Sequence, residues 1–144
     1  MAEEAGRGMS RARPSRESAR RATRGVTFDT GMLVALERRK ADALALLRAC
    51  RLSRARITIP AAVIAEWWRG THSAVLESGT LESLVPELAK QAGLLLARTG
   101  KSNAVDAIVI ASAAQRGDLV VTGDRLDLAE LAAEVDGVTV DSIR

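Results

Sequence analysis

The sequence predicts a three-layer α/β/α sandwich built on a parallel sheet of about five strands. Along residues 25–144, short segments of β-branched and other apolar residues alternate with helical segments. Helices between strands imply parallel strands that are joined by right-handed crossovers. The chain has 144 residues, of which 47% are hydrophobic and 27% charged. This length and composition predict one globular domain with a single core.

Each predicted strand is a short run rich in Val, Ile, Leu or Thr that is followed by turn or helix signals. The third is a short run of this kind, and the last lies close to the end of the given sequence. In chain order, the predicted strands are residues 26–29, 56–59, 81–85, 119–122 and 138–140.

Capping and proline signals bound the predicted helices. Thr30 is a candidate cap for the first helix, and Pro60 and Pro86 stand where proline is favoured, at the first position of a helix. Asn103 begins a further helix, which Gly117 ends. The predicted helices are residues 32–38, 42–52, 61–68, 86 to about 100, 103–116 and 126–134.

The positive charge of the chain is concentrated before the domain. Residues 1–25 hold seven Arg and three Glu, a net charge of +4, so residues 26–144 carry a net charge of −1. Residues 1–24 lack apolar periodicity, and we expect a disordered Arg-rich extension. The alternative is an electrostatic arm that gathers RNA. We expect the folded domain to span residues 25–144.

The remaining composition excludes several kinds of site. Cys50 is the only cysteine and His72 the only histidine, so an internal disulfide, a cysteine cluster for zinc and a His-based acid–base pair are all excluded. Cys50 lies in an apolar helical run, which favours a buried structural thiol. No segment approaches the roughly 18 uncharged apolar residues of a membrane helix. We expect a cytoplasmic protein whose chemistry is performed by carboxylates.

Four acids follow apolar segments, where an ionised group without a partner is costly. Asp29 ends the first strand and Asp124 follows the fourth. In open parallel sheets, ligands bind beyond the carboxyl ends of the strands, where the strand order reverses. If the first and fourth strands are neighbours, Asp29 and Asp124 face each other there.

The other two acids lie on helices. Val63 stands at i−3 from Glu66, which predicts that the Glu66 carboxylate lies on the buried side of its helix. Asp106 precedes an entirely apolar run. Converging carboxylates raise one another's pKa, and a bound divalent cation removes the conflict. Oxygen ligands favour Mg²⁺, with Mn²⁺ as a substitute.

Three of the four acids also have a structural explanation when each is considered alone, whereas a solvent-facing position for Glu66 conflicts with its apolar neighbours. Asp29 can cap the following helix, Asp106 can complete a capping box with Asn103, and Asp124 can be a turn residue. Asp127 is either a capping residue or an additional acid of the site. The four acids together favour a shared site over four separate structural roles.

Four motifs in order resemble the PIN-domain nucleases, specifically the toxin members of VapBC-type toxin–antitoxin pairs. A strand ends in Asp29 followed by Thr30, and a glutamate, Glu66, lies on the helix after the second strand. Asp106 stands in an Asp-Ala-Ile helix start, and the fourth strand leads into Thr122-Gly-Asp124. The resemblance covers nearly all of residues 25–144 and leaves out the extension.

The resemblance implies a metal-dependent endoribonuclease that forms a homodimer and is inhibited by a small antitoxin bound across its active-site groove. Asp29, Asp106 and Asp124 are the implied metal ligands, and Glu66 binds the metal through water or orients the nucleophile. Thr122 and Thr30 support them. Attack by an activated water on the phosphodiester leaves a 5′-phosphate.

Other functions lack comparable support in the sequence. A non-catalytic nucleic-acid-binding module usually presents aromatic side chains and a basic surface, whereas this domain is slightly acidic and has no Tyr. A Mg²⁺-dependent DNA nuclease or phosphatase uses similar acids, and only the resemblance favours RNA. Residues 99–102, Thr-Gly-Lys-Ser, are similar to the end of a phosphate-binding loop. Leu95 occupies the position where that motif requires glycine, which excludes such a loop.

Overall fold

A computed structural model describes residues 24–123 and 125–143, with the side chains of residues 125–127 left undescribed. Residues 1–23 of the expected extension therefore lie outside the described residues, as do Asp124 and the side chain of Asp127. Within the described part of the chain, no helix is long and apolar enough to cross a membrane.

The sheet has five parallel strands in the order β3-β2-β1-β4-β5. β1 is central, and β1 pairs directly with β4. This confirms the predicted sheet and the neighbourhood of the first and fourth strands. The strands are β1 (Val26–Phe28), β2 (Ile57–Pro60), β3 (Thr80–Glu82), β4 (Leu119–Thr122) and β5 (Thr139–Ser142).

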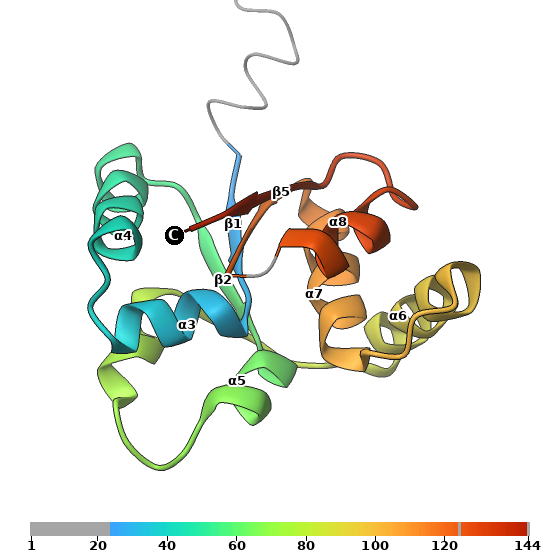
Figure 1. Cartoon of the computed structure of the whole chain (residues 1–144), viewed down its shortest axis with the longest axis horizontal. Coiled ribbons are helices and arrows are strands. Elements are labelled where there is room, and N and C mark those ends of the chain that lie inside the picture. Colours follow the sequence, from blue (N-terminus) through green and yellow to red (C-terminus); the bar gives the residue numbers. More distant parts are fainter. Residues whose placement is uncertain (1–23, 124, 144) are drawn as a thin grey trace, which may run out of the picture.

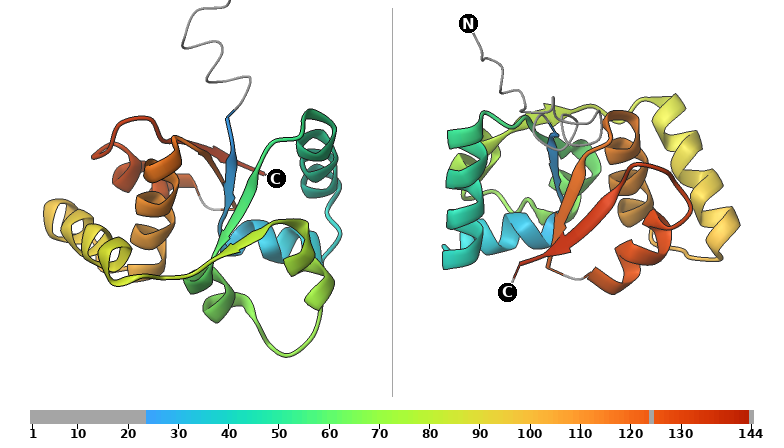
Figure 2. Two further views of the ribbon diagram at one scale, coloured as in Figure 1. Left: turned by 180° about the vertical axis from the view of Figure 1, so that it is seen from behind. Right: turned by 90° about the horizontal axis from the view of Figure 1, so that it is seen from above.

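Helices cover both faces of the sheet, as the predicted three-layer arrangement requires (Figures 1 and 2). α3 and α4 lie on one face, whereas α6, α7 and α8 lie on the other, and α5 lies at the carboxyl edge in contact with α3 and α7. The helices are α3 (Thr30–Glu37), α4 (Ala41–Ser53), α5 (Ala61–Trp67), the 3₁₀ helix η1 (Ser73–Ser78), α6 (Pro86–Thr99), α7 (Ala104–Arg116) and α8 (Arg125–Ala132).

Several element boundaries differ from the sequence predictions. Asp29, rather than Thr30, is the N-cap of α3. Pro60 is not the first residue of α5 but its N-cap, because Pro60 still pairs with Glu82 as the last residue of β2. β3 ends at Glu82, and the apolar residues Leu84 and Val85 that extended the predicted strand are exposed. η1 was not predicted, since it buries no residue and has no apolar periodicity.

The core is formed where the central strands meet the helices on each face. Phe28 of β1 and Ile59 of β2 are fully buried, as are Val109 and Ile110 of α7. Cys50 is buried as predicted. Helices cover both faces of β1. A polar side chain at the carboxyl end of β1 therefore lies inside this core or at its edge.

A buried polar network fixes α7 on the sheet. Asp118 is 2% exposed and accepts hydrogen bonds from Arg116 Nε (2.9 Å) and from the Thr27 hydroxyl (2.8 Å). Arg116 also donates to Glu82 (2.6 Å) and to the Ser112 hydroxyl (2.8 Å). Every charge in the network thus has an opposite partner, as a buried charge requires. The network joins β1, β3 and β4 to the helix that carries Asp106.

Arg24 contacts the domain although we assigned it to the extension. Its guanidinium donates to the carbonyl oxygens of Gly117 (2.7 Å) and Gly137 (2.9 Å) and to the Thr139 hydroxyl (2.9 Å). These bonds connect the segment before β1 to the turns before β4 and β5 and to the first residue of β5. The Arg24 side chain is therefore in contact with the domain.

Candidate functional site

A pocket of about 260 Å³ opens at the carboxyl edge of the sheet, where β1 and β4 diverge. The strand order reverses here, because the chain proceeds from β1 to β2 on one side and reaches β4 on the other. This is the position at which open parallel sheets bind ligands. The residues that line the pocket are Asp29, Thr30, Gly31, Glu66, Asn103, Asp106, Thr122 and Gly123.

Asp29 lies at the inner end of this pocket and is 6% exposed. Its Oδ1 caps α3 by accepting a hydrogen bond from the Met32 amide (2.9 Å), and the Thr122 hydroxyl and the Gly31 amide also donate to its carboxylate. Burial, and to a smaller degree the nearby charge of Asp106, nevertheless raise the pKa of Asp29 to about 6 against those hydrogen bonds. The capping role and the place in the pocket therefore coexist in one residue.

The surroundings of Asp29 differ from those of the other buried carboxylate, Asp118. Asp118 has the Arg116 guanidinium at 2.9 Å. Among the described residues, no Lys or Arg forms an ion pair with Asp29, and the charged group that influences it is a second acid, Asp106. A buried carboxylate beside another carboxylate, with neutral donors only, favours the binding of a cation.

Asp106 reaches the pocket from the opposite face of the sheet, in the first turn of α7. Its backbone N–H donates to the Asn103 side chain (3.0 Å), which makes Asn103 the predicted cap of the helix. That bond uses the amide of Asp106, and the half-buried carboxylate lines the pocket. Capping by Asn103 thus explains the start of α7, and the side chain of Asp106 lines the pocket.

Glu66 lines the pocket from α5, but the prediction that it lies on the buried side of its helix is wrong. The buried residues of α5 are Val63 and Trp67, four positions apart. Glu66 is exposed, and helical geometry places it about 100° from Trp67 and about 60° from Val63, to one side of that stripe. Its carboxylate accepts a hydrogen bond from the Thr30 hydroxyl. The Trp67 indole N–H donates to Glu37 of α3 (2.8 Å). α5 is therefore hydrogen-bonded to α3 through Glu66 and through the next residue, Trp67.

The fourth predicted acid, Asp124, lies outside the described residues. Its neighbours Thr122 and Gly123 line the pocket. The structure thus brings Asp29, Glu66 and Asp106 to one pocket together with Thr30 and Thr122. Within residues 24–123 and 125–143, no three acidic, histidine or cysteine side chains are grouped closely enough to hold a metal ion. The chemistry of the donors fits a divalent cation, since they are hard carboxylate oxygens and one of them is buried without a cation.

Two glycines that the sequence analysis missed allow the elements of the site to approach. A Cβ at Gly31 would lie 2.5 Å from the backbone nitrogen of Gly123 and 3.3 Å from Asp29 Oδ1. The first turn of α3 therefore rests directly on the loop after β4. A glycine in the first turn of a helix, and another between Thr122 and Asp124, were the available signals.

We expect Gly31→Ala to destabilise the protein by about 1–3 kcal/mol, because backbone atoms on both sides of the contact must move. Gly93→Ala is the matched control, since Gly93 is an exposed residue of α6 with nothing within 4 Å of its added Cβ. That substitution should stabilise the helix by up to about 1 kcal/mol. Urea unfolding of both variants measures the difference, and a similar change in both would contradict the close contact.

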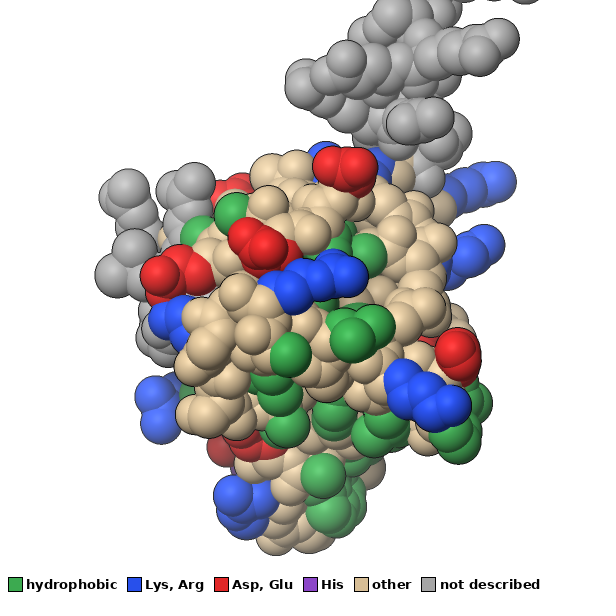
Figure 3. Space-filling model, turned by 90° about the vertical axis from the view of Figure 1, so that its right-hand side faces the viewer, with side chains coloured by type: hydrophobic (Ala, Val, Ile, Leu, Met, Phe, Trp, Pro, Cys, Tyr) green, Lys and Arg blue, Asp and Glu red, His purple; other side chains and the backbone are tan. Residues whose placement is uncertain are grey.

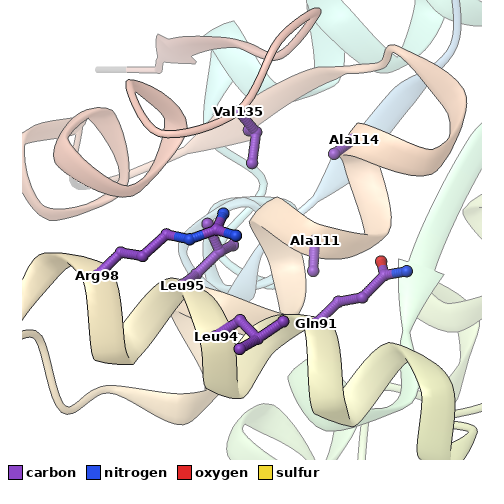
Figure 4. A pocket seen from close by; sticks show the side chains of 7 residues that line it. All are labelled: Gln91, Leu94, Leu95, Arg98, Ala111, Ala114 and Val135. Carbon is purple, nitrogen blue, oxygen red and sulfur yellow. The ribbon is translucent and has the colours of Figure 1, made fainter.

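A separate hollow of about 200 Å³ lies between α6, α7 and the segment after α8 (Figure 4). It is lined by Gln91, Leu94, Leu95, Arg98, Ala111, Ala114 and Val135. Exposed apolar side chains also occur on this side of the molecule, where they are interspersed with charged ones (Figure 3). The described residues that line this hollow include no acid, so we do not assign the expected hydrolytic chemistry to it.

Comparisons with known proteins agree with this architecture. The PIN domain family model matches residues 26–134 of the chain. No curated protein sequence gives a significant match. The solved structures with a similar fold include toxin–antitoxin complexes.

A chain of VapBC2 from Rickettsia felis, solved bound to a DNA fragment from its promoter, has a TM-score of 0.61 and 13% identity, covering 83% of this chain and 98% of that one. A toxin–antitoxin complex from Klebsiella pneumoniae gives a TM-score of 0.64 and 20% identity, covering 80% of this chain and 96% of that one. DNA-bound VapBC from Salmonella typhimurium gives a TM-score of 0.58 and 17% identity, covering 83% of this chain and 98% of that one. At these identities, the similarity establishes the fold.

Proposed function

We propose that this chain, which belongs to the PIN-domain family, is a metal-dependent endoribonuclease that acts as the toxin of a toxin–antitoxin pair. The observation that carries the proposal is the environment of Asp29. Its carboxylate is 6% exposed, has no cation paired with it among the described residues, and lies beside Asp106 in an open pocket. Such a site is completed by a divalent cation, and Mg²⁺ or Mn²⁺ suits its oxygen donors.

Asp29, Asp106 and Asp124 are the proposed ligands of the ion. A divalent cation held by these carboxylates would lower the pKa of a bound water and neutralise negative charge on the scissile phosphate. The Thr122 hydroxyl and the Met32 amide orient the Asp29 carboxylate. Glu66, held by the Thr30 hydroxyl, is placed to orient the attacking water.

The proposed partners are an RNA substrate, a small antitoxin and a second copy of the chain. The proposed location is the cytoplasm. Toxin–antitoxin complexes among the structural neighbours support the antitoxin. The preference for RNA over DNA and the homodimer rest on the resemblance to VapBC-type toxins. In this proposal the antitoxin inhibits by covering the carboxylate pocket.

Digestion of end-labelled tRNA, mRNA and DNA side by side, with Mg²⁺ or with EDTA, tests the proposed activity. We expect RNA to be cleaved in Mg²⁺ but not in EDTA. The products should carry a 5′-phosphate and a 3′-hydroxyl, because water attacks phosphorus and the 3′-oxygen leaves. A 2′,3′-cyclic phosphate would instead show that the ribose hydroxyl is the nucleophile. Cleavage of DNA alone, or undiminished cleavage in EDTA, would contradict the proposal.

A further inference from the structure

A second polar hollow adjoins the carboxylate pocket at the start of α7. It has a volume of about 220 Å³. Asn103 and Asp106 line both hollows, so the two are adjoining parts of one groove. The new part is lined by Lys101, Ser102, Asn103, Asp106 and Leu131.

Lys101 places a positively charged side chain beside the carboxylate pocket. Of the described side chains that line the two hollows, Lys101 is the only cation. It lies in the connection between α6 and α7, after Gly100, which ends α6 with a left-handed backbone (φ 71°). The segment before Lys101 is therefore a helix and not a strand, which agrees with the exclusion of a phosphate-binding loop of the nucleotide-binding type.

The ammonium group of Lys101 forms an ion pair with Glu130 of α8. The Glu130 side chain is 62% exposed and that of Lys101 is 31% exposed. Exposed ion pairs contribute little to stability, and water and salt compete with them. Glu130 can therefore be exchanged for another anion at small cost, and a phosphate accepts hydrogen bonds from the same ammonium.

We propose that Lys101 forms a phosphate subsite that binds the RNA backbone next to the scissile phosphodiester. The inference rests on the proposed function, because RNA is the ligand. A polyanion that enters the acidic pocket needs cationic contacts beyond the reacting phosphate, and Lys101 is the described cation beside it. The Ser102 hydroxyl and the Asn103 side chain add neutral hydrogen-bonding groups in the same hollow. Without RNA, Glu130 holds the ammonium at the groove.

The test measures binding of a short fluorescein-labelled single-stranded RNA to the full chain by fluorescence anisotropy across a range of salt concentrations. Asp29→Asn serves as the background in all proteins, so that the RNA stays intact. Lys101→Ala should weaken binding about three- to fivefold. It should also lower the log–log salt slope by about 0.7, the value for one single-strand phosphate contact.

Lys90→Ala is the matched control, because Lys90 is an exposed lysine of α6 that lines neither hollow. It should change neither the affinity nor the slope. Glu130→Gln should tighten binding, since it removes the anion that competes with phosphate for Lys101. This increase separates the subsite from a structural ion pair, which would be disrupted equally by either substitution.

Equal behaviour of Lys101→Ala and Lys90→Ala would overturn the subsite. Weaker RNA binding by the Glu130→Gln variant would also overturn the subsite. The ion pair would then act only by fixing the conformation of the connection between α6 and α7. Cleavage by the unmodified chain is measured separately. If it cleaves RNA and Lys101→Ala binds normally, the subsite alone fails. If it does not cleave RNA and Lys101→Ala weakens binding, the nuclease proposal fails, and Lys101 remains an RNA phosphate contact without a scissile bond beside it.

Discussion

Asp29→Asn is expected to reduce RNA cleavage by more than about 100-fold while the protein remains folded. Replacing groups behind a metal ligand already costs about 10- to 100-fold, and Asp29 is proposed as a ligand itself. Asparagine preserves the cap of α3, because its side-chain oxygen can accept the Met32 N–H as Asp29 does. Single-turnover cleavage and circular dichroism of the same preparations measure activity and folding.

The same substitution should stabilise the metal-free protein at neutral pH. The pKa of Asp29 is raised from 3.8 to about 6, so the folded state binds the proton more tightly than the unfolded state does. The wild-type protein therefore loses stability relative to Asp29→Asn as the pH rises from 3.8 to about 6, and the full difference persists above that range. Two pKa units correspond to about 3 kcal/mol, as an order of magnitude.

Unfolding of both proteins in EDTA at pH 4 and pH 8 measures this difference. The free energies of unfolding should nearly coincide at pH 4, and the variant should be more stable at pH 8. Asp42→Asn is a control, because Asp42 is an exposed acid in the first turn of α4, far from the pocket. Wild-type cleavage rates in Asp29→Asn would show that Asp29 is not part of the catalytic site.

Mg²⁺ is expected to raise the melting temperature of the wild-type chain and to be required for cleavage. An ion that binds only the folded state at 100 times its dissociation constant stabilises that state by about 2.7 kcal/mol. For a domain of this size, that is a shift on the order of 10 °C. Differential scanning fluorimetry in MgCl₂, with NaCl at equal ionic strength as the reference, measures the shift.

Asp29→Asn and Asp106→Asn should lose most of the Mg²⁺ shift, whereas Asp42→Asn should retain it. Mn²⁺ should replace Mg²⁺ in both assays. An equal shift in all four proteins would mean that Mg²⁺ binds elsewhere or acts through general screening. Full cleavage activity after exhaustive chelation would end the metal-dependent mechanism.

Much of the fold could be predicted because the local signals agree with the tertiary structure. Asn103 and Gly117 bound α7 as predicted, since a capping side chain and a left-handed glycine act within one turn of the helix. β4 has the predicted bounds, Leu119–Thr122. The strand order was open in the sequence, because the pairing of β1 with β4 joins residues about 90 positions apart.

The details of the site depend on contacts that the sequence does not record. Asp29 and Asp118 are both buried acids beside central strands, and only the position of the Arg116 guanidinium distinguishes the paired acid from the other. The approach of Gly31 to Gly123 likewise requires two segments to meet. Glu66 was assigned to the wrong face because α5 is too short for helical periodicity to fix its orientation.

The central claim is that Asp29, Asp106 and Asp124 hold one catalytic divalent cation, and Mn²⁺ binding measured by electron paramagnetic resonance tests it most directly. Titration of the metal-free chain should show saturable loss of the free Mn²⁺ signal, which added Mg²⁺ restores by competition. Asp29→Asn, Asp106→Asn and Asp124→Asn should each weaken this binding by at least about tenfold. Unchanged Mn²⁺ affinity in all three variants would contradict the account.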